Sequence, residues 1–184
     1  MGLNAQKTVS YEVGLWQEIS PSASFEVNLY YRDIYDLLSL AVVSTYNQIE
    51  YGIYTNKDYG NVRGLELKLD YSLDNLFIQT NYTYQFTRGN ADNPSQTFSR
   101  QGSSIDKVIR FIPMSWDQRH TFNVSLGYNT SKYGITSTGY YNSGTPYTFS
   151  PQGESNLALL NLYPNNDYKP SNYTIDLTSY LNLP

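Results

Sequence analysis

One histidine and no cysteine limit the chemistry open to this chain of 184 residues. Without cysteine, the chain forms neither a disulfide nor a thiolate metal site. A Ser-His-Asp triad would need His120 as its base, because the sequence has no other histidine. His120 begins an alternating run of apolar residues, which favours a structural role at a boundary over catalysis. The sequence therefore predicts no catalytic residue.

The candidate cation ligands are two pairs of loop carboxylates, Asp33 with Asp36 and Asp92 with Asp106. Neither spacing matches the regular ligand pattern of a calcium loop, so solvated loop charge accounts for them. The glycines are isolated in strands and turns and form no phosphate-binding loop. We therefore expect no metal and no cofactor.

Charge and hydropathy restrict the partners of the chain. The net charge is -4 and no basic run occurs, which excludes nucleic acid as an expected partner. The longest apolar patch, residues 37–43, is far shorter than the ~18 residues that a membrane helix needs. If the protein enters a membrane, it does so with strands.

Tyrosine is unusually frequent, with 20 residues, and charged residues make up only 15% of the chain. A typical charged share is about 25%. Because tyrosine joins an apolar ring to a polar tip, it favours boundaries between wet and dry surroundings. The composition fits a surface that meets something less polar than water.

Alternating runs carry the organisation of the chain. They lie at residues 9–17, 24–32, 62–71, 77–86, 119–128, 133–141 and 173–181. These are about seven strands of roughly 9 to 11 residues, the length of a tilted membrane-crossing strand.

The connections between these runs alternate between short and long. The short turns lie at residues 20–22, 72–75 and 129–132, and the long segments at 33–60, 87–118 and 143–171. Within the first long segment, the pattern predicts a helical turn at 34–39, a weak strand at 48–54 and a turn at 56–61. Outer-membrane barrels have this arrangement of short turns at one end and long loops at the other.

Each run has an apolar and a polar face. In a barrel, we expect the following residues of the polar face to line the lumen: Glu12, Glu26, Glu66, Lys68, Asp70, Arg119, Asn123 and Asp176. The reason is that Lys or Arg on the lipid face costs about 2 to 4 kcal/mol at the membrane midplane. Tyrosines near strand ends are expected at the membrane interfaces, together with Trp16: Tyr31, Tyr71, Tyr84, Tyr128, Tyr133 and Tyr141.

Two alternatives remain open from the residues alone. A soluble β-sandwich, such as a carbohydrate-binding module, also alternates and has one wet face. A small passive porin-like barrel is the other alternative. The aromatic residues of the long loops are the candidate ligand contacts: Trp116, Tyr147, Tyr163 and Tyr168.

Several segments in order resemble the C-terminal part of the β-barrel of TonB-dependent outer-membrane receptors. They are residues 113–120 (PMSWDQRH), 143–148 (SGTPYT), 7–14 (KTVSYEVG), 30–37 (YYRDIYDL), 59–67 (YGNVRGLEL) and 81–84 (NYTY). The resemblance implies an all-β fold, an antiparallel up-and-down transmembrane β-barrel segment of about seven to eight strands within a barrel of about 22.

The same resemblance implies a place in the bacterial outer membrane and transport rather than catalysis. The family imports large scarce nutrients, namely metal chelates, cobalamin, oligosaccharides or peptides. It takes energy from TonB, ExbB and ExbD through an N-terminal plug domain. The chain starts without an apolar signal segment and ends within a strand pattern. We therefore expect residues 1–184 to be a partial barrel domain that contributes wall, lumen lining and extracellular loops, in contact with lipid and with the absent plug.

Overall fold

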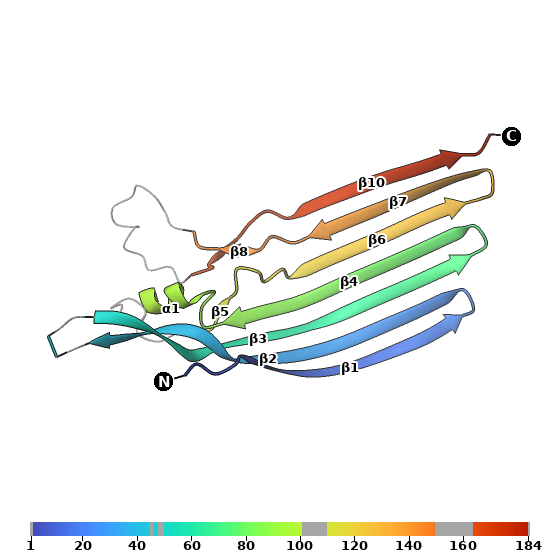
Figure 1. Cartoon of the computed structure of the whole chain (residues 1–184). Coiled ribbons are helices and arrows are strands. Elements are labelled where there is room, and N and C mark those ends of the chain that lie inside the picture. Colours follow the sequence, from blue (N-terminus) through green and yellow to red (C-terminus); the bar gives the residue numbers. More distant parts are fainter. Residues whose placement is uncertain (1, 45, 48–49, 101–109, 150–163, 184) are drawn as a thin grey trace.

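Seven long strands lie side by side in one antiparallel sheet, in sequence order (Figure 1). The computed structural model describes residues 2–44, 46–47, 50–100, 110–149 and 164–183. The long strands are β1 (Lys7–Ser20), β2 (Ala23–Ser44), β3 (Glu50–Leu73), β4 (Leu76–Gly89), β6 (His120–Asn129), β7 (Tyr133–Asn142) and β10 (Asn172–Leu181). This confirms the predicted seven main strands of an antiparallel, up-and-down sheet.

Smaller elements gather at one end of the sheet. Helix α1 (Pro94–Arg100) and strand β5 (Ile112–Pro113) follow β4, and β5 pairs with the end of β4. Strands β8 (Pro146–Tyr147) and β9 (Asp167–Tyr168) form a separate two-stranded sheet. Within the described ranges, no helix is both long and apolar enough to cross a membrane.

The predicted alternation of short and long connections is confirmed in part. The tight β1–β2, β3–β4 and β6–β7 turns all lie at one end of the sheet, and the long β4–β6 and β7–β10 connections lie at the other (Figure 1). The third predicted long connection, residues 33–60, is largely strand, because β2 ends at Ser44 and β3 begins at Glu50. In the β3–β4 turn, Asp74 has a φ of 50°, a left-handed conformation that Asp tolerates. We call the opposite end the long-loop end.

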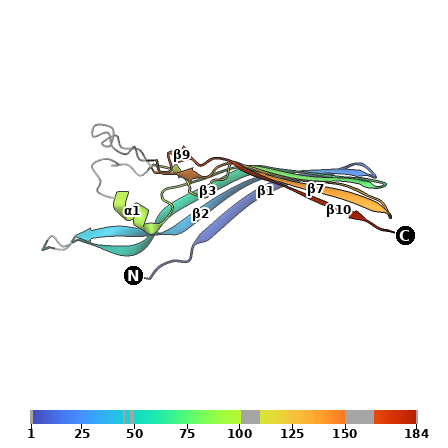
Figure 2. The same ribbon diagram turned by 90° about the horizontal axis from the view of Figure 1, so that it is seen from above.

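The predicted helical turn at residues 34–39 and the turn at 56–61 are wrong. Strands β2 and β3 continue through both segments as a long, twisted extension (Figures 1 and 2). The pairing shifts register between Ile34 and Leu37 and again between Leu37 and Leu38, and Asp36 has a φ of 58°. Such bulges insert an unpaired residue and reset the alternation, so the period of two that marks a strand is lost in the sequence.

The register gives the sheet two distinct faces, because paired residues of neighbouring strands point to the same side. The apolar face is typified by the row Leu15, Val27, Leu67, Tyr82 and Phe122. The polar face is typified by the row Glu26, Lys68, Asn81, Asn123 and Tyr140.

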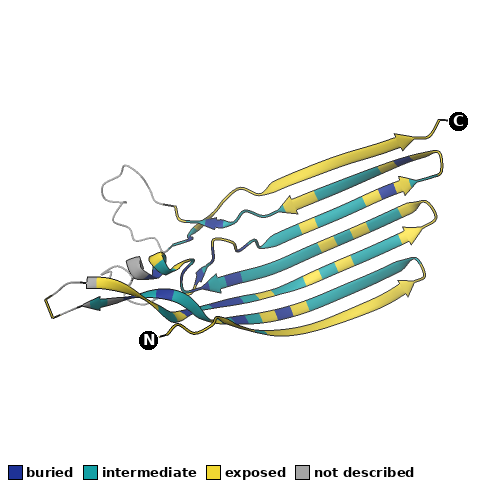
Figure 3. Cartoon of the chain, viewed as in Figure 1, coloured by how far each residue is buried: buried dark blue, intermediate teal, exposed yellow. Residues whose placement is uncertain are grey.

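Burial is concentrated at the long-loop end. The edge strands β1 and β10 are exposed along almost their whole length, as Figure 3 shows. Among the described residues, the largest fully buried side chains are Ile112, Asp117, Pro146 and Ser39, none of which lies in the regular part of the wall. The sheet therefore has no core of its own and resembles a piece of barrel wall.

Candidate functional site

The polar face forms a continuous hydrophilic stripe across the wall. By register it carries seven of the predicted lumen residues: Glu12, Glu26, Glu66, Lys68, Asp70, Asn123 and Asp176. Their ion pairs are well exposed, with Arg32 to Glu12 at 2.8 Å and Lys68 to Asp70 at 3.3 Å. Exposed pairs contribute little to stability, so these charges serve a wetted surface rather than a core.

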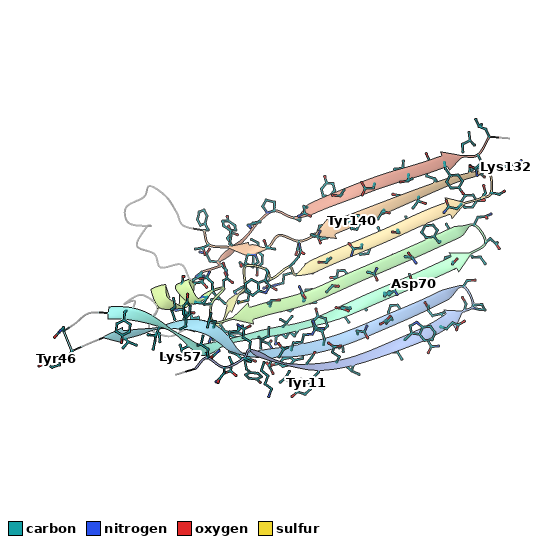
Figure 4. The ribbon with its side chains drawn as sticks, in the orientation of Figure 1. Tyr11, Tyr46, Lys57, Asp70, Lys132 and Tyr140 are labelled. Atoms are coloured by element: carbon teal, nitrogen blue, oxygen red, sulfur yellow. The ribbon has the colours of Figure 1, made fainter. Side chains whose placement is uncertain are left out.

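The six predicted interface tyrosines all lie on the apolar face. Near the short turns, the rings of Tyr128 and Tyr133 have centroids 6.2 Å apart. Toward the long-loop end, the ring of Tyr84 packs edge-on against Phe86 at 5.0 Å. Figure 4 marks Tyr11, another aromatic residue that the register places on this face, where β1 approaches the twisted extension.

Trp16 does not belong to this set. It pairs with Glu26 and therefore lies on the polar face, so its predicted place in the interface girdle is wrong. Its position next to a short turn suggested the interface girdle, whereas the alternation of residues in β1 predicts the polar face that the pairing shows.

His120 has a structural environment. Its Nδ1 and the Tyr82 hydroxyl are 2.8 Å apart in a hydrogen bond, and its ring stacks on that of Tyr84 at 4.9 Å. All three residues lie on the apolar face. The side chain ties β6 to β4 at the aromatic band, and its described contacts include no partner for nucleophilic catalysis.

Asp117 organises the long-loop end. It is fully buried and accepts hydrogen bonds from the Thr87 N–H at 2.6 Å and from Nε of Arg119 at 3.0 Å. Arg119 in turn donates from Nη2 to the Tyr168 hydroxyl at 2.7 Å. Its guanidinium also lies 4.4 Å from the ring centroid of Phe86. The structure thus brings the predicted lumen residue Arg119 and the predicted loop contact Tyr168 together.

Asn165 joins two of the long connections, a role that the sequence did not predict. It is buried, has a φ of 57°, and donates from Nδ2 to Asp92 at 2.7 Å and to the Pro113 carbonyl at 2.8 Å. A signal was present, because Asn is one of the few residues that accept a positive φ. Its partners, however, are far away in sequence.

The other loop aromatics are dispersed. Trp116 is exposed and lines a hollow of about 190 Å³ with Ile34, Val62 and Met114. Tyr147 donates to Asp167 at 3.0 Å, and this hydrogen bond is the main reason that the pKa of Tyr147 is raised. Tyr163 lies outside the described residues.

No group of three or more His, Asp or Glu side chains within the described ranges is placed to hold a metal ion. A long-stranded antiparallel sheet with a lipid-type apolar face, aromatic bands and a wet opposite face defines a segment of a transmembrane β-barrel.

The sequence matches the family model described as TonB dependent receptor-like, beta-barrel, over residues 1–183. The chain therefore belongs to the TonB-dependent receptor β-barrel family, whose place is the bacterial outer membrane. No curated protein matches it.

Solved structures share the fold. The outer membrane transporter YddB from Escherichia coli superposes with a TM-score of 0.67 at 14% identity, over 96% of this chain and 26% of that one. The FrpB iron transporter from Neisseria meningitidis (F3-3 variant) gives a TM-score of 0.63 at 15% identity, over 98% and 24%.

A third similar structure is the ferric-catecholate import receptor Fiu from E. coli K12, with a TM-score of 0.62 at 13% identity, over 97% and 22%. The chain thus spans about a quarter of the length of these transporters.

Proposed function

We propose that residues 1–184 form part of the barrel of an outer-membrane importer for a large, scarce nutrient and perform no catalysis. The main support is the unbroken polar face, in which charged residues recur on neighbouring strands while the opposite face stays apolar. In a closed barrel the polar face would line the lumen. The remaining strands, a plug domain and the TonB–ExbB–ExbD machinery would belong to the whole protein.

The long-loop end would capture the substrate first. It offers Trp116 beside an apolar hollow and Tyr168 beside Arg119, so that stacking and charge-assisted hydrogen bonding occur close together on one end of the wall. The polar face would then pass the substrate through water-filled space. Candidate substrates are a metal chelate, cobalamin, an oligosaccharide or a peptide, and similarity in fold to iron transporters does not select among them.

The test uses the full-length protein in the outer membrane of cells with and without TonB. Uptake would be measured for four labelled probes: a ferric catecholate chelate, cobalamin, a maltooligosaccharide and a short peptide. The proposal expects saturable uptake of one probe that disappears without TonB. Trp116→Ala should weaken binding of that probe at least tenfold. The matched control is Trp16→Ala, which removes an equally exposed tryptophan far from the loops.

Uptake that persists without TonB and does not saturate would replace this proposal by the passive porin. A Trp116→Ala protein that binds the probe as tightly as the parent would remove the loop end from substrate capture.

A further inference from the structure

Three aromatic rings on the polar face each cover a glycine of the neighbouring strand. The pairs are Tyr30 of β2 with Gly64 of β3, Phe77 of β4 with Gly127 of β6, and Tyr180 of β10 with Gly134 of β7. A Cβ at Gly127 would meet three atoms of the Phe77 ring, and at Gly64 or Gly134 it would lie 2.6 Å from Cζ of the paired tyrosine. Real Cβ atoms do not approach so closely, so each ring occupies the space that a side chain would need. We call each pair a ring–glycine joint.

The three joints lie at the three interfaces between hairpins. Tight turns join β1 to β2, β3 to β4 and β6 to β7 into hairpins, and β10 pairs with the last of them (Figure 1). The joints connect β2 with β3, β4 with β6, and β7 with β10. Inside the hairpins, no glycine whose surroundings are described lies under a ring of its hairpin partner; Gly14, for example, meets the amide of Asn28.

The interfaces between hairpins lack the turn that fixes register within a hairpin. Residues 90–119 separate β4 from β6, and residues 143–171 separate β7 from β10. Between β2 and β3, the bulges near Asp36 separate the tip of the extension from the wall. A slip of one residue would turn every side chain to the wrong face, but a slip of two keeps each side chain on its own face. The hydrophobic pattern therefore does not oppose a slip of two residues.

A ring–glycine joint does oppose that slip. If β4 and β6 slipped by two residues, Phe77 would face Ser125 or Asn129 in place of Gly127. Both of these residues carry a Cβ in the space that the ring needs. The other two joints behave alike, since Tyr30 would face Val62 or Glu66, and Tyr180 would face Lys132 or Thr136.

The two tyrosines also form hydrogen bonds on the far side of their glycines. The Tyr30 hydroxyl donates to Oε1 of Gln85 at 2.9 Å, and Gln85 is the partner of Gly64 on β4. The Tyr180 hydroxyl donates to the carbonyl of Thr130, in the β6–β7 turn, at 2.5 Å. Each ring thus crosses the glycine and reaches an acceptor in the adjoining hairpin, which a slipped register would move away.

We propose that the ring–glycine joints determine the register in which successive hairpins pair when the barrel assembles. An aromatic side chain that packs over a cross-strand glycine is a device that sets register in a sheet. The partner that each joint recognises is the next hairpin of the same chain. This role in assembly is independent of the nutrient that the protein imports.

The experiment refolds the full-length protein from urea into phosphatidylcholine vesicles and maps the register by cysteine cross-linking. Residues 1–184 contain no cysteine of their own. Gln79→Cys with Ser125→Cys reports the native register, because these residues are directly paired. Gln79→Cys with Asn123→Cys, and Asn81→Cys with Ser125→Cys, report the two slipped registers. These diagonal pairs are ~7–8 Å apart in the native sheet, too far for a disulfide.

The parent protein should give the native cross-link alone, whereas Phe77→Ala should also give slipped products. Gly127→Ala should do the same, because the added methyl group displaces the ring. The double variant Phe77→Gly with Gly127→Phe rebuilds the joint from the opposite strand and should restore the native cross-link alone.

Two controls match these variants. Phe122→Ala removes a ring of the same size between the same two strands, but from the apolar face. Gly60→Ala adds a methyl group to a strand glycine where the nearest atom is 3.4 Å away, an ordinary contact. Both should keep the native cross-link alone. A heat-dependent gel shift reports whether each variant is folded.

Three results would overturn the proposal. A native cross-link alone in Phe77→Ala would show that the register does not need the ring. Slipped products in Phe122→Ala at the same level would show a general effect of lost aromatic packing. If Phe77→Ala does not fold, the double variant decides: a folded barrel in native register supports the joint, and an unfolded or slipped one contradicts it.

Discussion

The wall and the long-loop end of this protein are stabilised in different ways. In the wall, apolar side chains such as Leu67 and Val124 lie in rows across neighbouring strands and stay partly exposed on one face of a single sheet. At the long-loop end, polar side chains such as Asp117 and Asn165 are buried and join segments distant in sequence. Figure 3 shows the same division, with buried residues concentrated beside the loops.

The two regions therefore depend on different interactions for their stability. The wall needs lipid on its apolar face and further strands at its free edges, because an open sheet edge in lipid leaves backbone groups unsatisfied. The long-loop end depends on a small number of hydrogen bonds within the chain. A change in the loop network should therefore loosen the loops and leave the wall intact, and a change on the apolar face should do the reverse.

The largest expected effect follows from Asp117→Ala. Asp117 is fully buried, and its removal leaves Nε of the half-buried Arg119 without its acceptor, a loss of about 1 to 3 kcal/mol for a hydrogen bond to a charged group. Here the Thr87 N–H also loses its acceptor. We expect fast amide exchange and protease cleavage in residues 110–119 of the full-length protein, with unchanged exchange in β6 and β7.

Asp74→Asn is the control for this change. Asp74 lies in the exposed β3–β4 turn with a φ of 50°, and Asn accepts that conformation equally well. If Asp117→Ala instead destabilised the whole wall, the two regions would form one cooperative unit and the comparison would fail.

The next largest effect is expected from Leu67→Arg in the wall. Leu67 lies between Val27 and Tyr82 on the apolar face. An arginine on the lipid face costs about 2 to 4 kcal/mol at the midplane, falling toward the interfaces. The measurement is the free energy of unfolding of the full-length protein from lipid vesicles in guanidinium chloride.

Thr121→Arg is the matched control, since Thr121 pairs with Thr83 and Asn142 on the polar face. It should change the free energy of unfolding far less. Equal losses in the two variants would contradict the assignment of the apolar face to lipid.

The same division explains what the sequence could predict. The wall follows from local alternation, so all seven strands and the faces of residues such as Glu66 and Tyr84 were predictable. The bulges near Asp36 were not, because one unpaired residue shifts the phase of the pattern and hides a strand. Ion pairs along the polar face join neighbouring strands or neighbouring positions and add no information about the loops.

The loop network could not be predicted for a different reason. Asp117 binds Thr87, 30 positions away, and Asn165 binds Asp92, 73 positions away. No periodicity encodes such contacts, since each depends on how a long connection folds back on the sheet. Trp116 and Tyr168 both lie at the long-loop end, but no pattern in the sequence indicates that they line different hollows.

The smallest expected effect concerns pH and the extension of β2 and β3 beyond the aromatic band. The Asp33 carboxylate accepts hydrogen bonds from the Tyr59 hydroxyl and from Nδ2 of Asn61, and the bond from Tyr59 is the main cause that lowers the pKa of Asp33. A carboxyl whose pKa is lower in the folded state stabilises that state above its unfolded pKa of about 3.9. This contribution is lost as the pH falls through the lowered value.

Tyr59→Phe tests this directly. It removes the hydroxyl that donates to Asp33 and keeps the ring, which packs at a tilt against Tyr35 and stacks on Phe111, with centroids at 5.4 Å and 5.6 Å. In the parent protein, amide exchange in residues 50–60, corrected for intrinsic rates, should accelerate as the pH is lowered from about 6 to about 3. In Tyr59→Phe this acceleration should begin at a higher pH, because the folded-state pKa of Asp33 moves back toward its ordinary value.

The amides of β6 and β7 provide the reference, since the wall has no such buried carboxylate between those strands. Identical pH profiles in parent and variant would show that the Tyr59–Asp33 hydrogen bond does not stabilise the extension. The stability of the extension would then come from the pairing between β2 and β3.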